Sequence, residues 1–448
     1  MAKTSLVYVC SNCDAQSPKW SGRCLSCGSW GTIGKEPTSS DVLRPASTVL
    51  RTPGDLKNFA ALGLHPIKPT LATTFEGLDL VLGGGLVEGS ATLLAGEPGM
   101  GKSTLLSQVA LGMARQGKKI LYVTGEESPA QIHLRLTRLS PSVSDNLSYL
   151  DDTRAEIITA TIEAAKPDLA IVDSIQSVTT DLASGEAGNV SQVKACAALL
   201  TQTAKKTGVP IILVGQVTKD GDIAGPRVLE HVVDTVLSLE GDKLHRFRIL
   251  RALKHRFGST DETALLDMNE NGLNIITDPS VALLDARVAA AAGSAVSAVL
   301  EGRRPLLVEL QALVTSAGYS APVRKANGLD ASRLNMLLAV LTRHAGIQVY
   351  DKDVFANAAG GLSVRDPGAD LALAAAISSA VKNQPIDPKT AYFGEIGLTG
   401  ELRPVALPEL RIKEIARMGF KTVVCPPLKN PPAGIEIVQC KTVREALS

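Results

Sequence analysis

Three things that the sequence has little of narrow the kind of protein it can encode. Aromatic residues make up only 3% of its 448 residues, so alanine, valine, leucine and isoleucine must fill any core. Charge of one sign is not in excess, since 46 basic residues face 45 acidic ones and leave a formal net charge of +1. An overall basic excess would have indicated nucleic acid, but a local basic face is still possible. No run of about 20 apolar residues occurs, which argues against a membrane span.

The first residues, MAKTSLVYVC, are too short and polar a stretch to be a signal peptide. We therefore expect a cytoplasmic location. Seven cysteines are present, and in that compartment they indicate a metal site or free thiols before disulfides.

The pattern of residues divides the chain into segments. Residues 1–34 are rich in cysteine and glycine, and residues 35–69 are rich in proline, serine and threonine, which is typical of a linker. Residues 70–275 form one predicted domain, residues 276–286 a junction, and residues 287–448 a second domain long enough for its own core.

Short apolar runs alternate with helical patterns in residues 70–275. SATLLAG, KILYVTG, LAIVDS and VPIILVGQV read as strands, and residues 101–115 read as a helix that stops near Gly117. Such runs between helices predict an α/β fold with a parallel sheet covered on both faces.

The residues GEPGMGKST follow the run SATLLA and fit the pattern G-x4-G-K-[S/T]. Glycines let the backbone curl so that N–H groups face phosphate oxygens, and the helix N-terminus adds partial positive charge. Lys102 would reach the β- and γ-phosphates of ATP, and the Ser103 hydroxyl would hold Mg²⁺. The predicted nucleotide-binding residues are Gly96, Glu97, Pro98, Gly99, Met100, Gly101, Lys102, Ser103 and Thr104.

Polar residues that end other apolar runs complete the predicted catalytic site. Asp173 ends LAIVDS and suits the shell of the Mg²⁺ ion. Glu126 follows KILYVTG and would polarise the attacking water, although its neighbour Glu127 is an alternative and both could be solvated acids at a helix start. Gln216 ends VPIILVGQV and would sense the γ-phosphate, unless it is an ordinary polar strand end.

The cysteine pairs Cys10-x2-Cys13 and Cys24-x2-Cys27 predict a structural Zn²⁺ site. Two redox pairs or thiols without a ligand are the alternatives. A module this small cannot bury enough surface to fold alone, and metal binding would supply the missing free energy. Trp20 and Trp30 are expected to pack around the site. The other cysteines, Cys196, Cys425 and Cys440, are expected to be core thiols.

Taken together, these motifs resemble the bacterial RadA family, also called Sms. The resemblance covers nearly the whole chain and rests on the four-cysteine finger, GEPGMGKST, YVTGEES, LAIVDSIQS, VTKDG…AGPRVLEH and LKHRFG. It implies a RecA-like ATPase that forms a hexameric ring and processes recombination intermediates by branch migration. It also implies a repair partner such as the RecA recombinase.

The resemblance also assigns roles to the segment KHRFG. The family's usual motif is KNRFG, so His255 stands where asparagine is expected. The resemblance implies that Lys254 and Arg256 reach into a neighbouring subunit's nucleotide site, where a cation would neutralise charge developing on the γ-phosphate. Without the resemblance, these residues would be interpreted as a basic strand end on a solvated face. Gln216 is a second departure, because histidine is common there in relatives.

Residues 287–448 resemble the α+β proteolytic domain of Lon proteases, most clearly in VRDPGADLALAAAISSA. Such a protease needs a serine activated by a lysine. The serine position aligns with Ala369 and the lysine position falls near residues 409–411, with Lys413 a neighbour. We therefore expect a scaffold and no protease.

Single-stranded or branched DNA is the expected partner, bound through its backbone without sequence specificity. In RecA-like rings the loops at residues 181–189 and 219–227 would line the channel, so Lys219 and Arg227 would contact phosphates. A second basic group would also contact DNA, with an ordinary solvated face as the alternative. It comprises Arg303, Arg304, Arg324, Lys325 and Arg333. The sequence predicts an ATP-driven DNA motor; an ATP-dependent protease or chaperone and a non-motor ATP switch are the alternatives.

Overall fold

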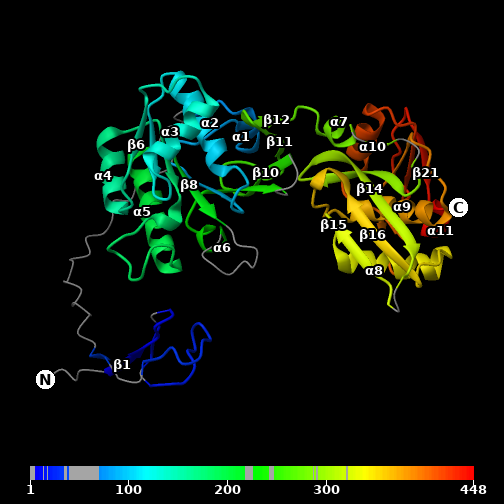
Figure 1. Cartoon of the computed structure of the whole chain (residues 1–448), viewed down its shortest axis with the longest axis horizontal. Coiled ribbons are helices and arrows are strands. Elements are labelled where there is room, and N and C mark those ends of the chain that lie inside the picture. The colour runs from blue at the N-terminus through cyan, green and yellow to red at the C-terminus, as the bar shows by residue number, and fades with distance from the viewer. Residues whose placement is uncertain are drawn as a thin grey trace, which may run out of the picture. The chain divides into compact units, whose positions relative to one another are not determined.

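The computed structural model describes residues 6–13, 15–17, 19–34, 38–39, 70–216, 226–241, 247–285, 287–288, 291–318 and 321–448. The chain divides into two compact units, residues 1–67 and 68–448, which are taken separately below (Figure 1). Within the described residues, no helix has the length and apolar character needed to cross a bilayer.

The first unit is a small three-stranded sheet in the order β2-β1-β3. Its strands are β1 (Leu6–Val9), β2 (Gln16–Ser17) and β3 (Thr38–Ser39). Among the described residues of this unit, the buried apolar core is Cys10, Cys24 and Ile33, with Tyr8 and Ala15 packed against them. So few buried groups agree with a module that relies on a metal for its stability.

The larger unit begins with a nine-stranded sheet in the order β12-β11-β10-β9-β4-β8-β7-β5-β6 (Figure 1). Its strands are β4 (Ala91–Gly96), β5 (Ile120–Thr124), β6 (Leu147–Leu150), β7 (Leu169–Asp173), β8 (Ile211–Gln216), β9 (Thr235–Gly241), β10 (Phe247–His255), β11 (Thr263–Asn269) and β12 (Gly272–Ile275). Its helices are α1 (Glu76–Val81), α2 (Lys102–Arg115), α3 (Pro129–Leu139), α4 (Ala155–Ala165), α5 (Val190–Thr207) and α6 (Pro226–Leu229), with a 3₁₀ turn at Ile175–Ser177.

Alternating side chains of the central strands fill two separate cores. Successive residues of a strand point to opposite faces, so Leu94 packs with α1, α2 and α3 whereas Leu93 packs with α4 and α5. Strand β4 is buried along its whole length, as expected for a strand covered on both faces. The predicted α/β class and the helix over residues 101–115 are confirmed.

The prediction of a purely parallel sheet was incomplete. Strands β9, β4, β8, β7, β5 and β6 are parallel, but β10, β11 and β12 extend the sheet in antiparallel fashion. The physical reason is the short connection between these strands, since Asn269 ends β11 and Gly272 begins β12. A two-residue connection can only join antiparallel strands.

Residues beyond 287 build a second sheet in the order β15-β16-β14-β13-β17-β20-β21. Its strands are β13 (Ser294–Glu301), β14 (Arg304–Ser316), β15 (Arg324–Asn327), β16 (Lys352–Ala358), β17 (Thr390–Tyr392), β20 (Thr422–Cys425) and β21 (Glu436–Gln439), beside a hairpin of β18 (Glu395–Ile396) and β19 (Leu402–Arg403). Its helices are α8 (Ala331–Val340), α9 (Asp370–Lys382), α10 (Pro408–Arg417) and α11 (Val443–Ala446).

Helices cover both faces of this second sheet. Ala295 and Val299 of β13 pack in the cluster that holds α8 and α9, whereas Val296 and Ala298 pack with α10. The mixture of parallel and antiparallel strands with separate helices is the predicted α+β arrangement.

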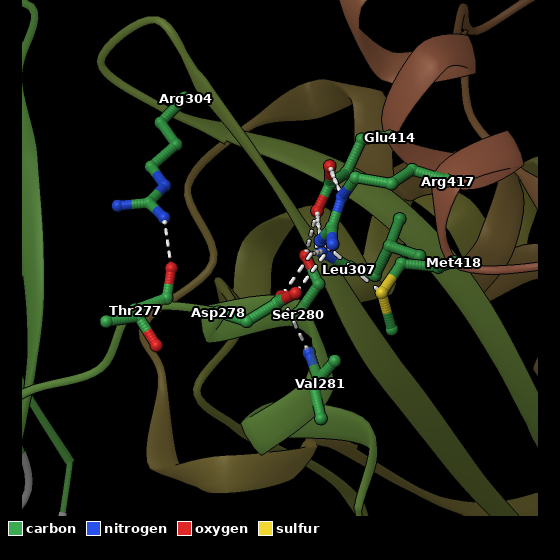
Figure 2. A network of polar contacts seen from close by, with 9 residues as sticks. All are labelled: Thr277, Asp278, Ser280, Val281, Arg304, Leu307, Glu414, Arg417 and Met418. Atoms are coloured by element: carbon green, nitrogen blue, oxygen red, sulfur yellow. Dashed lines mark hydrogen bonds and ion pairs between the residues drawn. The ribbon is translucent and has the colours of Figure 1, made fainter.

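The junction predicted at residues 276–286 contains a short helix, α7 (Pro279–Leu284). Figure 2 shows that polar contacts hold it against α10: both oxygens of the Asp278 carboxylate accept hydrogen bonds from Arg417, and the Ser280 hydroxyl donates to Glu414. The Arg417 hydrogen bonds keep the pKa of Asp278 below its usual range. The junction therefore belongs to the packing of the C-terminal sheet. The division into domains at residues 70–275 and 287–448 remains a prediction, because residues 68–448 form one compact unit.

Candidate functional site

The predicted phosphate-binding loop joins the end of β4 to the start of α2. Gly96 leaves no room for a side chain, because a Cβ there would lie 2.5 Å from the Leu239 carbonyl oxygen. Gly101 has a φ of 101°, a left-handed conformation that favours glycine, and it directly precedes α2. The glycines of the motif are therefore required by the backbone path that brings N–H groups toward a phosphate.

Lys102 lies inside the curve of this loop. Its side chain is buried, and its Nζ atom donates hydrogen bonds to the carbonyl oxygens of Gly96 (2.8 Å) and Glu97 (3.0 Å). Ser103 follows it in the first turn of α2, where the helix N-terminus carries partial positive charge. The donor set fits the triphosphate and Mg²⁺ of ATP: an ammonium group and free backbone N–H groups for phosphate, and a hydroxyl for the ion.

Asp173 ends β7, and a buried tyrosine of the next strand holds its carboxylate. The hydroxyl of Tyr122 donates a 2.7 Å hydrogen bond to Oδ2 of Asp173. Burial, together with the charge of Asp173, raises the pKa of Tyr122 well above its ordinary value. Tyr122 was not among the site residues predicted from the sequence. A tyrosine in an apolar strand next to a catalytic strand is a usable signal, because a buried hydroxyl usually finds a partner.

Glu126, Gln216 and Ser174 meet where β5, β8 and β7 end. The Gln216 side-chain amide donates to both carboxylate oxygens of Glu126, at 3.2 Å and 3.0 Å, and the Ser174 hydroxyl also donates to this carboxylate. Glu127 forms an ion pair with Arg135 instead. The geometry therefore favours Glu126 as the group available to an attacking water, and it links Gln216 directly to that group.

Lys254 and Arg256 lie at the other edge of the same sheet, which is the end where β4 and β9 begin. The Lys254 Nζ atom donates to the carbonyl oxygens of Val233 (2.8 Å) and Glu230, and Arg256 pairs with Asp234 at 3.0 Å. Asp234 in turn accepts a hydrogen bond from the backbone N–H of Ala91, the first residue of β4. The phosphate loop follows the last residue of that strand. The sequence motif therefore does not lie in the nucleotide site of its own chain.

His255 has a structural role between these two cations. Its Nδ1 atom lies 3.0 Å from the Thr235 hydroxyl, and its Nε2 atom lies 3.2 Å from the Leu82 carbonyl oxygen. The ring thus ties the end of β10 to β9 and to the residue that follows α1. Burial and the neighbouring Arg256 charge lower the pKa of Lys254 below its ordinary value.

The four cysteines of the first unit converge. Their sulfur atoms all lie within 4.8 Å of one another, with Cys10 and Cys27 3.8 Å apart and Cys13 and Cys24 3.6 Å apart. A tetrahedral zinc ion at about 2.3 Å from each sulfur would hold them about 3.8 Å apart, so the site fits Zn²⁺. Hydrogen bonds with Ser29 lower the pKa of the Cys27 thiol to about 5.

Other predictions about cysteine and tryptophan had mixed outcomes. Cys196, Cys425 and Cys440 are buried, as predicted, and burial raises the pKa of Cys425 to about 12. The prediction that both tryptophans pack around the metal was wrong for Trp30, which is 76% exposed. The described core beside the four sulfurs is instead formed by Ile33 with Cys10 and Cys24.

The predicted DNA-contacting residues are dispersed. Lys219 and the side chain of Arg227 lie outside the described residues, whereas the loop at residues 181–189 is described and largely exposed. In the C-terminal half, Arg333 is engaged in an ion pair with buried Asp370. Arg304 donates to the Thr277 carbonyl oxygen at 3.1 Å, and Arg303 lies 3.9 Å from Asp261. Arg324 and Lys325 are exposed on β15.

The two positions that correspond to a protease dyad lie close together but hold other chemistry. Ala369 is buried at the start of α9. A Cβ added at its neighbour Gly368 would lie 2.7 Å from Nη1 of Arg411, which is itself fully buried and pairs with Asp366 at 2.6 Å. Lys413 is exposed. These positions therefore carry a methyl group and a structural ion pair where a nucleophile and its base would have to be.

The loop, the carboxylates at the strand ends and the thiolate cluster define an ATP-hydrolysing P-loop protein with a RecA-like core, using ATP, Mg²⁺ and Zn²⁺. An AAA domain model matches residues 69–222, and a rubredoxin metal binding domain model matches residues 8–35. Over its whole length the chain is similar to proteins named DNA repair protein RadA: 41% identical to that of Bacillus subtilis, 43% to that of Pseudomonas aeruginosa and 43% to that of Aquifex aeolicus, covering 100% of this chain and 99% of each relative. The chain belongs to the RadA family of DNA repair proteins.

One solved structure is also similar in part. It is a KaiC-like protein from Pyrococcus horikoshii, 20% identical, with a TM-score of 0.38 over 46% of this chain. A score this low says nothing further about the present molecule.

The zinc site makes a direct prediction. Native protein should hold about one zinc ion per chain, and Cys27→Ser should lose it, because three thiolates leave a structural site open. Metal analysis by mass spectrometry measures this, with Cys196→Ser as the matched control, since that thiol is buried in the core of the other compact unit. Native protein without zinc would contradict the assignment.

Proposed function

We propose that the chain is a ring-forming, DNA-dependent ATPase that moves on single-stranded or branched DNA during recombinational repair. To the ATPase core of this family the proposal adds ring formation, movement on DNA, a cytoplasmic location and the RecA recombinase as a partner. One observation carries it: the cations Lys254 and Arg256 lie at the opposite sheet edge from the phosphate loop of their own chain.

The length of β4 sets the distance between these cations and the phosphate loop of the same chain. Six extended residues separate the two edges by about 20 Å. A side chain cannot span that distance, so these cations can reach a γ-phosphate only in another subunit. A contact in which one edge of a subunit meets the opposite edge of the next is heterologous, and repeated contacts of this kind form a ring when the rotation between subunits closes and a helical filament when it does not. Arg256 is 46% exposed, which leaves it free to exchange Asp234 for such a partner.

Each described residue then has a defined task. Lys102 neutralises the phosphates, and Ser103 with Asp173 orients the Mg²⁺ ion that polarises them. Glu126 accepts a proton from the attacking water, because of the two adjacent acids that follow β5 it is the one without an ionic partner among the described residues. Gln216 exchanges its contact with Glu126 for the γ-phosphate, and so couples the nucleotide state to the segment that follows β8.

That coupling supports a DNA motor. The segment after Gln216 contains Lys219 and Arg227, and the segment after Asp173 leads to the exposed loop at residues 181–189. Cations at a channel bind DNA through its phosphates and release counterions, so binding weakens as salt rises. The protease alternative lacks support, because Ala369 offers no nucleophile. A non-motor switch stays the second candidate.

Single-stranded DNA should accelerate ATP hydrolysis by at least several-fold, because Gln216 would couple the nucleotide site to the segment that contains Lys219 and Arg227. Steady-state phosphate release with and without an oligonucleotide measures this, at two salt concentrations so that the expected loss at higher salt is visible. A hydrolysis rate that ignores DNA at both salts would favour the switch.

The contribution in trans predicts complementation between two inactive variants. Lys102→Ala should not hydrolyse ATP, and Arg256→Ala should be slower by roughly 10³-fold, the usual effect of losing such a cation. In an equal mixture about one interface in four joins an intact phosphate loop to an intact Arg256, so about a quarter of the native rate should return.

A second mixture is the control. Lys102→Ala and Glu126→Gln both damage the same subunit's half of the site, so mixing them should restore nothing. If the first mixture is also no faster than the average of its components, then the cations do not act across a subunit interface.

A further inference from the structure

The two tryptophans of the chain, Trp20 and Trp30, both belong to the zinc module, and both are exposed. Trp20 is 48% exposed and Trp30 is 76% exposed. The core of the module is formed by Cys10, Cys24 and Ile33, so the indoles add little to its stability. Large aromatic side chains left open on so small a module indicate a surface that contacts another molecule.

Contacts within the module hold both rings and leave about half of Trp20 and most of Trp30 exposed. The Trp20 indole N–H donates to the Ile33 carbonyl oxygen at 3.3 Å. The Trp30 ring lies beside Gly22, where an added Cβ would be 3.9 Å from the ring. Arg23 places its guanidinium carbon 5.9 Å from the centre of the Trp30 ring, and its Nε atom is held by the Gly28 carbonyl oxygen at 2.9 Å. A surface already in its binding geometry loses little conformational entropy on binding.

The charge around these rings is positive. Lys19 and Arg23 flank Trp20, and the part of the module that the structure describes contains no acidic residue; Asp14 lies outside it. Apart from Leu25 and the metal-site residue Cys27, the exposed residues from Lys19 to Gly31 other than the two rings are glycine, serine and these two cations. Unpaired bases stack on aromatic faces while nearby cations hold the phosphates, and the described part of the module offers both.

We propose that the zinc module binds single-stranded nucleic acid, with bases stacking on Trp30 and Trp20 and phosphates held by Arg23 and Lys19. This site lies outside the ATPase core and needs no ATP. It goes beyond the proposed function, because it adds a DNA contact that does not depend on the segments at residues 181–189 and 219–227. Stacking does not read sequence, so binding should show little preference among bases.

The chain supplies its own probe. Because both tryptophans lie in this module, tryptophan emission, excited where tyrosine does not absorb, reports on the module alone. Oligothymidylate titrated into full-length, zinc-loaded protein without ATP should quench this emission. In parallel, the fluorescence anisotropy of a labelled oligothymidylate measures binding anywhere on the protein.

Three variants separate stacking from folding. Trp30→Ala should weaken oligonucleotide binding by roughly ten-fold, the usual effect of losing one stacked base. Trp30→Phe should retain most of the affinity, because it keeps an aromatic face. Leu25→Ala is the matched control, since Leu25 is 92% exposed and apolar but cannot stack, and it should bind as the native protein does. All three should hold one zinc.

The outcomes distinguish this site from the proposed motor. Anisotropy that reports binding while the tryptophan emission stays constant would overturn the proposal and leave the motor intact. Emission that responds to a recombinase filament but not to oligothymidylate would also overturn it, in favour of a protein-binding surface. Quenching without stimulation of ATP hydrolysis would support the site and count against the motor.

Discussion

The curve of backbone between Gly96 and Lys102 is the constraint on which the rest of the molecule depends. The Leu239 carbonyl oxygen presses against Gly96, and Gly101 must take a left-handed conformation, so the loop has one path. Along that path the Lys102 ammonium sits between two carbonyl oxygens with little exposure to water. These carbonyl groups hold the cation in position but do not neutralise it, so a polyphosphate entering the loop meets an oriented positive charge.

Strand order gives this loop its catalytic surroundings. Strand β4 lies beside β8, and β8 beside β7 and then β5, so Gln216, Asp173 and the residues after Thr124 reach the same edge. The carboxylate of Glu126 and the amide of Gln216 are in contact there, which joins the proposed general base to the last residue of β8. The other edge holds Arg256 through Asp234. A sheet with a phosphate site at one edge and a cation at the other has the polarity that head-to-tail assembly requires.

The parts that the sequence predicted correctly are local ones. The phosphate loop is nine consecutive residues whose geometry follows from their own backbone preferences, and the thiolate pairs each sit on one turn. The contact between Glu126 and Gln216 spans 90 positions and follows from strand order, which the apolar runs do not encode. The bond from Tyr122 to Asp173 has the same origin. The antiparallel pairing of β10–β12 was not predicted, because a buried strand has the same apolar pattern whether its neighbour is parallel or antiparallel. Trp30 was misplaced because a large apolar side chain was assumed to be buried.

The central claim is that the loop at residues 96–103 and the carboxylate of Asp173 together bind magnesium-bound ATP. Calorimetric titration with a non-hydrolysable ATP analogue tests it most directly, in the presence of Mg²⁺ and again after the ion is chelated. Native protein should bind the analogue, and its affinity should fall when Mg²⁺ is removed. Lys102→Ala should bind far more weakly, although its unfolding temperature should equal that of the native protein. Binding that is equally tight without Mg²⁺ and without the lysine, or no binding at all, would contradict the account.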